Sequence, residues 1–125
     1  MALVQFLRAR LDEDEQIALS HRQWSPDWYF DDTAGEIRDS VNRGTVAFVP
    51  AELDATHIAR HDPARALAEV EAKRRIIADY ERYVAERRRA MGGWDSYPGE
   101  SPILAALAAV YADHPDYRDD WRPST

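Results

Sequence analysis

The sequence predicts an α+β fold that is mainly helical, with about four helices, one of them long and central, and a small antiparallel sheet of two or three strands. Two observations support this prediction. From Asp62 to about Arg89 helix-forming residues fill the chain, with no glycine or proline after Pro63. Residues 24–50 instead lose the helical spacing and combine β-branched and aromatic residues with turn formers.

The long central helix has clear start and stop signals. Asp62 is a suitable N-cap because its carboxylate can accept the free amide hydrogens of the first turn. Pro63 fits the first helical position, where no amide hydrogen is needed. Gly92 and Gly93 mark the expected end. A short helix and this long helix should together occupy residues 51–91. The long helix alone, with roughly 28 residues, should be about 42 Å long.

Two regions precede these helices. In residues 1–21, apolar residues recur at three- and four-residue spacings, which predicts a first helix. In the small sheet over 24–50, the clearest strand is 45–49, and a returning strand is expected over 36–41. A sheet this small needs a helix to cover one of its faces.

Two regions follow the long helix. A last helix is expected over 101–112, because Ser101 can cap its first turn. The tail, 113–125, is rich in aromatic and charged residues. We expect it to run extended and to lay Tyr117 and Trp121 on the body of the protein.

The composition favours a single domain over residues 1–125, since 45% of the residues are hydrophobic and the length suits one core. The formal net charge of −7 argues against broad binding to nucleic acid or anionic membrane. There is no cysteine, which excludes disulfides and thiolate chemistry. Because neither a signal-peptide pattern nor a membrane-spanning apolar run is present, we expect a cytoplasmic protein.

Histidines provide one candidate site. His57 and His61 are four residues apart, a spacing that on one continuous helix would let both imidazoles bind a metal. Asp54, Asp62 or His114 could supply a third ligand. The proline after Asp62 predicts that the helix ends near His61, which works against this geometry. The alternative is that His57 packs against the sheet and His61 shapes the bend.

No catalytic signature stands out, so an enzymatic function is not indicated and no cofactor is expected. Carboxylates are plentiful, but no pair is singled out, and both the nucleophile elbow and the glycine-rich phosphate loop are missing from the sequence. Arg87, Arg88 and Arg89 complement the negative end of the long helix. The alternative is a nucleic-acid patch formed with the aromatic tail, although neighbouring aspartates there would repel phosphates.

An apolar stripe runs along the long helix and comprises Ala66, Val70, Ile77, Tyr80 and Val84. It is widened by Leu67, Ile76 and Tyr83. It is long for the small domain that must cover it, and an uncovered stripe costs solubility. A two-fold antiparallel pairing of two long helices would cover it, so we expect a homodimer. The candidate interaction surface consists of Ile77, Tyr80, Val84, Tyr117 and Trp121.

Three blocks also carry a family resemblance: Leu7–Glu15, His57–Arg65 with Glu69–Ile76, and Tyr111–Arg118 with Trp121–Pro123. In this order they resemble a family of small proteins, a domain of unknown function found in actinobacteria and their phages. The blocks cover about half of the chain. The resemblance implies no particular activity.

Many members of that family carry a Cys-x-x-Cys pair and a further cysteine between the second and third blocks, which implies a cysteine–histidine zinc site in them. This chain has no cysteine there. Of such a site, only His57, His61 and His114 could remain.

Our leading hypothesis is a small acidic protein-interaction module, an accessory factor of a phage or its host, with a protein partner that could be a second copy of itself. One alternative is a small metal-binding protein or enzyme centred on His57, His61, Asp62 and His114. The other is nucleic-acid binding through the arginine run that ends at Arg89. We expect no membrane partner.

Overall fold

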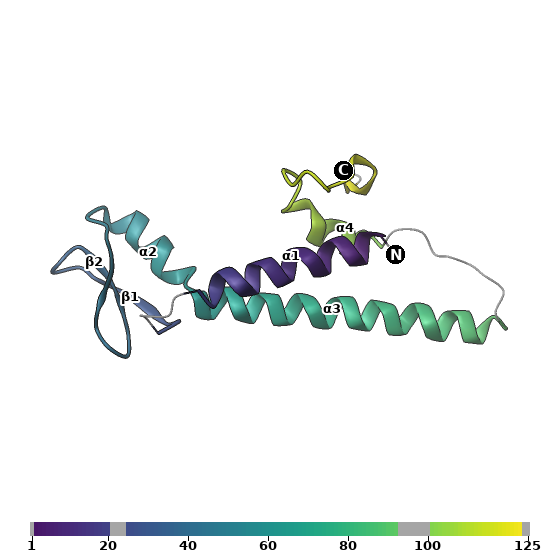
Figure 1. Ribbon diagram of the computed structural model, residues 1–125, viewed down its shortest axis with the longest axis horizontal. Coiled ribbons are helices and arrows are strands. Elements are labelled where there is room, and N and C mark those ends of the chain that lie inside the picture. Colours follow the sequence, from purple (N-terminus) through teal and green to yellow (C-terminus); the bar gives the residue numbers. More distant parts are fainter. Residues whose placement is uncertain (1, 21–24, 93–100, 124–125) are drawn as a thin grey trace. The chain divides into compact units, whose positions relative to one another are not determined.

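The computed structural model describes residues 2–20, 25–92 and 101–123 (Figure 1). Over these residues it confirms the α+β prediction, with four α-helices, one of them long, and a three-stranded antiparallel sheet. In chain order the elements are α1 (Ala2–Ala18), β1 (Trp28–Asp31), β2 (Glu36–Asp39), β3 (Thr45–Phe48), α2 (Glu52–Arg60), α3 (Pro63–Ala90), α4 (Pro102–Ala109) and the 3₁₀ helix η1 (Asp119–Trp121).

The chain divides into two compact units. The first unit consists of Met1–Asp12 and Glu71–Thr125, and the second unit is Glu13–Val70. Each unit has its own buried residues and is described by itself.

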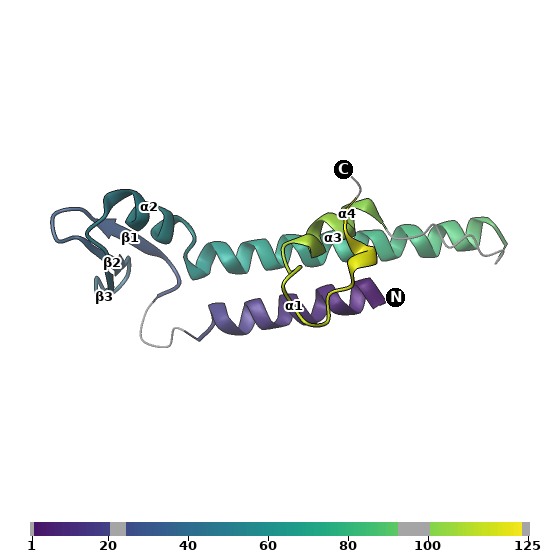
Figure 2. The same cartoon turned by 90° about the horizontal axis from the view of Figure 1, so that it is seen from above.

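In the first unit, the beginning of α1 runs antiparallel to α3, side by side with it in both views (Figures 1 and 2). Ion pairs from Arg8 to Glu81 and from Asp12 to Arg74 connect the two helices. Apolar side chains of α1, α3, α4 and η1 form the core because they recur at helical spacing on the inner faces. The buried apolar residues of this unit are Leu3, Val4, Phe6, Leu7, Leu11, Ile77, Leu104, Ala105, Ala108 and Trp121.

In the second unit, the sheet has the strand order β1-β2-β3 with antiparallel neighbours. Gly35 forms the turn between β1 and β2 with a φ of 66°, a left-handed conformation that glycine adopts without strain. Helix α2 packs on β1 and β2, so the sheet has the helical cover that its small size requires. Ile37 and Ala55 are fully buried in this unit.

The predicted ends of α3 are confirmed. The carboxylate of Asp62 accepts the amide hydrogen of Arg65 at 2.9 Å, and Pro63 is the first helical residue. After the helix, Gly92 has a φ of 64°, the left-handed conformation that closes many helices. Gly93, the other predicted stop residue, lies outside the described part of the chain.

Helix α2, which precedes α3, and the N-cap of α4 also agree with the sequence predictions. Helix α2 spans nearly all of the short helix expected before Pro63. Ser101 caps α4, because its hydroxyl accepts the amide hydrogen of Leu104 at 3.3 Å.

Two predicted helices extended beyond the helices in the structure. Helix α1 ends at Ala18 and not near residue 21, which itself lies outside the described residues, as does residue 24. The hydroxyl and the amide of Ser20 both donate to the carbonyl of Ile17, so the chain turns there. Helix α4 ends at Ala109 instead of residue 112, because the following amides bond to carbonyls three residues back.

The tail is not extended as expected. The amide of Tyr117 donates to the carbonyl of His114, and the amide of Trp121 donates to the carbonyl of Arg118. These turns and η1 coil the tail back on itself. Within the described part of the chain, no helix is both long enough and apolar enough to cross a membrane.

Candidate functional site

An aromatic cluster surrounds Phe6 in the first unit. Its ring centroid lies 5.1 Å from that of Trp121 and 5.9 Å from that of Tyr117. The rings of His114 and Tyr111 follow at 5.7 Å and 6.2 Å, both edge-on. The tail thus places both of its aromatic rings on the body of this unit, as the sequence led us to expect.

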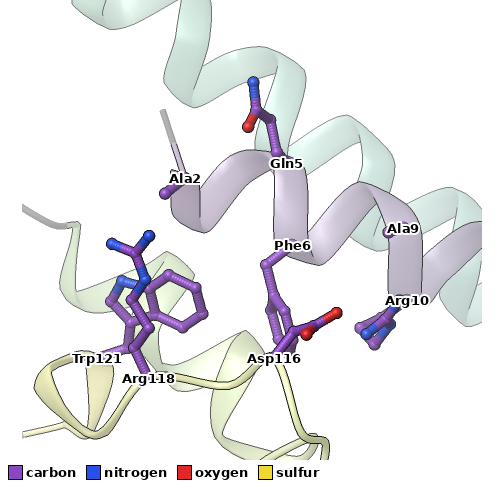
Figure 3. A pocket seen from close by; sticks show the side chains of 8 residues that line it. All are labelled: Ala2, Gln5, Phe6, Ala9, Arg10, Asp116, Arg118 and Trp121. Atoms are coloured by element: carbon purple, nitrogen blue, oxygen red, sulfur yellow. The ribbon is translucent and has the colours of Figure 1, made fainter.

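A pocket opens beside this cluster (Figure 3). Its volume is about 480 Å³, and α1, the tail and η1 supply its walls. Phe6 and Trp121 are nearly completely buried and form apolar parts of the lining, while two arginines and one aspartate add charge. The residues lining the pocket are Ala2, Gln5, Phe6, Ala9, Arg10, Asp116, Arg118 and Trp121.

Arg10 is held firmly in the pocket wall. Arg10 is only 7% exposed, and its guanidinium carbon lies 5.2 Å from the ring centroid of Phe6. One guanidinium nitrogen, Nη1, lies 2.7 Å from Nδ1 of His114, to which the amide of Asp116 also donates at 3.0 Å. These contacts hold the guanidinium of Arg10 against the ring of His114.

Arg118 supplies the second guanidinium. It is exposed, and its guanidinium carbon stacks 5.3 Å from the ring of Trp121. The carboxylate of Asp116 lies in the same lining with its side chain 78% exposed. Nearby, Arg122 stacks on Tyr117 and pairs with an aspartate, and it does not line the pocket. The pocket therefore combines aromatic surface with two cations and one solvated anion.

The two histidines of the predicted site lie side by side at the end of α2. The rings of His57 and His61 lie 4.4 Å apart, and His61 Nδ1 is 2.9 Å from the carbonyl oxygen of His57. Both residues are exposed, so the interpretation that His57 packs against the sheet was wrong. His61 does cap the end of α2, as expected for the bend.

The other proposed ligands have structural partners. Both carboxylate oxygens of Asp62 accept backbone amides, Oδ1 from Arg65 at 2.9 Å and Oδ2 from Trp28 at 3.0 Å. His114 belongs to the first unit, where it contacts Arg10. Among the residues that the structure describes, no group of three or more His, Cys, Asp or Glu is arranged to hold a metal ion.

A second carboxylate organises the turn after β2. Asp39 is fully buried, and its Oδ1 accepts hydrogen bonds from the amides of Asn42 and Val41 and from the hydroxyl of Ser25, at 2.8 to 2.9 Å. The hydrogen bond from the Asn42 amide is the main reason that the pKa of Asp39 lies below its usual value. These bonds end the strand at Asp39, two residues before the predicted end.

The predicted interaction stripe is largely covered by the chain itself. Ile77 is only 1% exposed, so it belongs to the core of the first unit and not to its surface, whereas Tyr80 and Val84 are half-buried. The large apolar side chains of α3 that are exposed belong to the residues just before Ile77 and Val84. Ile76 is 39% exposed and Tyr83 is 52% exposed. These two residues are seven positions apart and lie on one helix face.

Charged residues flank this exposed face. Along one side, their signs alternate from positive to negative at spacings of four and three residues. Arg75 also pairs with Glu71 of the same helix at 2.6 Å, and Arg82 pairs with Asp79. The flanking residues are Arg75, Asp79, Arg82 and Glu86.

The arginine run at the end of α3 is exposed, and Arg87 Nη1 donates to the hydroxyl of Tyr83 at 3.3 Å. Sequence reasoning missed the pocket, and it counted Ile76 and Tyr83 as part of the apolar stripe without separating them as an exposed face. Weak signals existed for both. Phe6 and Arg10 are four residues apart on one helix, and the aliphatic and aromatic pair on α3 has heptad spacing.

A family model described as a family of unknown function (DUF6221) matches residues 1–123. This match bears out the resemblance to a family of unknown function seen in the sequence blocks. No curated protein and no solved structure gives a match.

Proposed function

The chain belongs to this family of unknown function, and we propose that it acts as a small acidic protein-interaction module whose partner is a second copy of itself. Such a module would serve as an accessory factor of a phage or its actinobacterial host. As part of this proposal, we place its activity in the cytoplasm.

The proposed contact surface is the exposed face of α3. Ile76 and Tyr83 are two helical turns apart, about 10 Å along the axis. Single exposed apolar residues are common on protein surfaces and carry no argument by themselves. Here an aromatic and an aliphatic side chain share one face of a long helix, which is how helices present themselves to another helix.

The charge order beside this face is the observation that carries the proposal. Arg75, Asp79, Arg82 and Glu86 read plus, minus, plus, minus along α3. Reading the same residues backwards inverts every sign. An antiparallel copy of the helix therefore places each charge opposite its complement.

In that arrangement, Arg75 lies opposite Glu86 of the second copy and Asp79 lies opposite Arg82 of the second copy. Ile76 then packs against Tyr83 of the second copy, and the two-fold axis repeats each contact. In a two-fold parallel pairing, this charged side of one helix would face the other side of its partner, so the four residues would not pair with one another. The pattern supports one orientation as well as one partner.

The two adjacent isoleucines provide a matched test. Ile76→Asp changes an exposed position and should leave the protein folded but monomeric, because it places an unpaired charge in the interface. Ile77→Asp changes a buried position and should unfold the first unit. Sedimentation velocity at tens of micromolar and circular dichroism distinguish these results. A wild-type chain that sediments as a monomer would contradict the proposal.

A charge exchange tests the orientation. Arg82→Glu alone and Asp79→Arg alone should each weaken self-association, since each places like charges opposite one another. Mixing the two variants should restore a heterodimer in which every pair is again complementary. If the mixture associates no better than the separate variants, the antiparallel arrangement is wrong.

A further inference from the structure

We propose that His57 and His61 form a two-ligand site for a late divalent transition metal ion, such as Ni²⁺ or Cu²⁺. Both histidines belong to the second unit, at the end of α2, so the site does not rest on the proposed self-association through α3. Imidazole nitrogen is a preferred ligand of these ions, whereas Mg²⁺ and Ca²⁺ prefer oxygen. Two ligands leave positions on the ion for water or for a donor group from outside the chain.

Both histidines are on the side of α2 that faces away from the sheet. Ala55 is fully buried and Ala59 is half-buried, and α2 packs on β1 and β2. Each histidine follows one of these alanines by two positions, which is about 200° around a helix axis. His57 and His61 are accordingly exposed, so an ion can reach them from solvent.

A hydrogen bond prepares the ring of His61 for a metal. Its Nδ1 lies 2.9 Å from the carbonyl oxygen of His57. A carbonyl oxygen can only accept, so in this contact Nδ1 is the nitrogen that carries the hydrogen. The lone pair of the neutral ring is then on Nε2. Metal-binding histidines are commonly held in this way, with one nitrogen donating to a carbonyl and the other bound to the ion.

The separation of the two rings suits adjacent positions on one ion. Their centroids lie 4.4 Å apart, and their planes are inclined by 33°. Two imidazoles that bind an ion at about 2.1 Å and at a right angle to each other have centroids about 4.5 Å apart. Right-angled ligand positions are those of the tetragonal and square-planar sites that Cu²⁺ and Ni²⁺ favour.

The charges around the pair also permit a cation. His57 lies in the last turn of α2 and His61 is its C-cap, where the helix dipole places partial negative charge. Asp54, one turn before His57, adds one negative charge. Arg60 adds one positive charge, but it is exposed, so water and salt screen it.

Titration calorimetry with the full chain, at about pH 8 where imidazole is neutral, measures the affinity for Ni²⁺. Because one imidazole holds the ion beside the second, the wild-type chain should bind Ni²⁺ at least about tenfold more tightly than a chain with only one of the two. Mg²⁺ controls for the general attraction of cations to an acidic chain and should bind far more weakly. Ni²⁺ is paramagnetic, so NMR line broadening centred on the end of α2 should locate the ion.

Variants of α2 separate chelation from binding to a single histidine. His57→Gln and His61→Gln each remove one exposed ring, and each should weaken Ni²⁺ binding about tenfold or more. Combining them should weaken it little further, because either change alone destroys the chelate. Arg60→Gln is the matched control, since it alters an exposed neighbour in the same turn and should leave the affinity equal or slightly higher. Circular dichroism checks that each variant remains folded.

Three results would overturn the assignment. One is an equal Ni²⁺ affinity of the wild-type chain and both single histidine variants. Another is equal binding of Mg²⁺, which would mean that only the overall charge is recognised. The third is a loss in only one histidine variant, or an equal loss in Arg60→Gln, since the two rings would then not act as a pair. None of these results depends on whether the chain forms a dimer.

Discussion

The two units of this chain are stabilised in different ways. The first unit buries a continuous set of apolar and aromatic side chains from three helices and the tail, with Leu7, Ile77 and Trp121 among them. The second unit buries few large apolar side chains and also two carboxylates, Asp39 and Asp62, that hold backbone amides. Apolar burial therefore dominates in one unit, and hydrogen bonds to buried carboxylates have a larger share in the other.

The two units also differ in which of their surfaces are available to a binding partner. In the first unit, the core packing leaves a pocket beside Trp121 and an exposed face at Ile76 and Tyr83. In the second unit, Asp62, which looked like a candidate ligand, is used to hold the chain in place. A buried carboxylate is thus a poor guide to function until its hydrogen bonds have been accounted for.

The largest expected effect is on the first unit. Leu7→Ala removes a side chain that is only 1% exposed and should cost about 2 to 5 kcal/mol of unfolding free energy, through lost apolar burial and the cavity left behind. Chemical denaturation measures the loss, and hydrogen exchange locates it in α1 and α4. Leu53→Ala is the control, because Leu53 is 86% exposed and its loss should change the stability by less than about 0.5 kcal/mol.

The elements predicted best are those whose signals are local. Asp62 and Pro63 define the start of α3, Gly92 defines its end, and Ser101 defines the start of α4, because each acts on amides or dihedral angles within a few residues. The tail was predicted worst. Its position depends on contacts with α1, and no short stretch of sequence shows that Trp121 will pack on Phe6.

The second prediction addresses the polar unit. Asp62→Ala removes both the cap of α3 and the acceptor for the Trp28 amide, which should cost about 1 to 2 kcal/mol. Hydrogen exchange should show faster exchange of the Trp28 and Arg65 amides, with the α4 amides little changed. Asp54→Ala, an exposed position in α2, is the matched control. Equal effects of the two variants would mean that the buried carboxylate has no special role.

The candidate sites were harder to predict than the helices, because a site can join residues that are far apart in the sequence. His57 and His61 were found because they are close in sequence, and their rings do lie side by side. The pocket brings together Phe6 and Arg118, which are more than one hundred residues apart. Ile77 is buried and Ile76 is exposed because of how the helix is rotated about its own axis. Two consecutive isoleucines in a sequence do not show which of them faces the core.

The third prediction concerns acid. The pKa of Asp31 is lowered mainly by the hydroxyl of Thr33, and that of Asp39 mainly by the amide of Asn42. A carboxyl whose pKa is lower in the folded state stabilises that state fully above its unfolded pKa, about 3.9. This stabilisation is lost as the pH falls from there through the lowered folded value. Asp39→Asn should therefore show a smaller loss of thermal stability between about pH 4 and pH 2 than the wild type.

Calorimetry at a series of pH values measures that difference. Asp54→Asn is the control, since Asp54 is an exposed residue of α2. If Asp39→Asn and the wild type lose stability in parallel over this range, the turn carboxylate does not contribute to the acid sensitivity.

The smallest expected effect concerns the ion pair between Arg74 and Asp12, which joins α3 to α1 within the first unit at 2.8 Å. Both side chains are more than a third exposed, so water and salt screen the attraction and the pair should contribute less than about 1 kcal/mol. A double-mutant cycle with Arg74→Ala, Asp12→Ala and the combined variant measures the coupling directly. A coupling above about 2 kcal/mol would mean that charges, and not buried apolar side chains, hold these helices together, and the contrast between the two units would no longer stand.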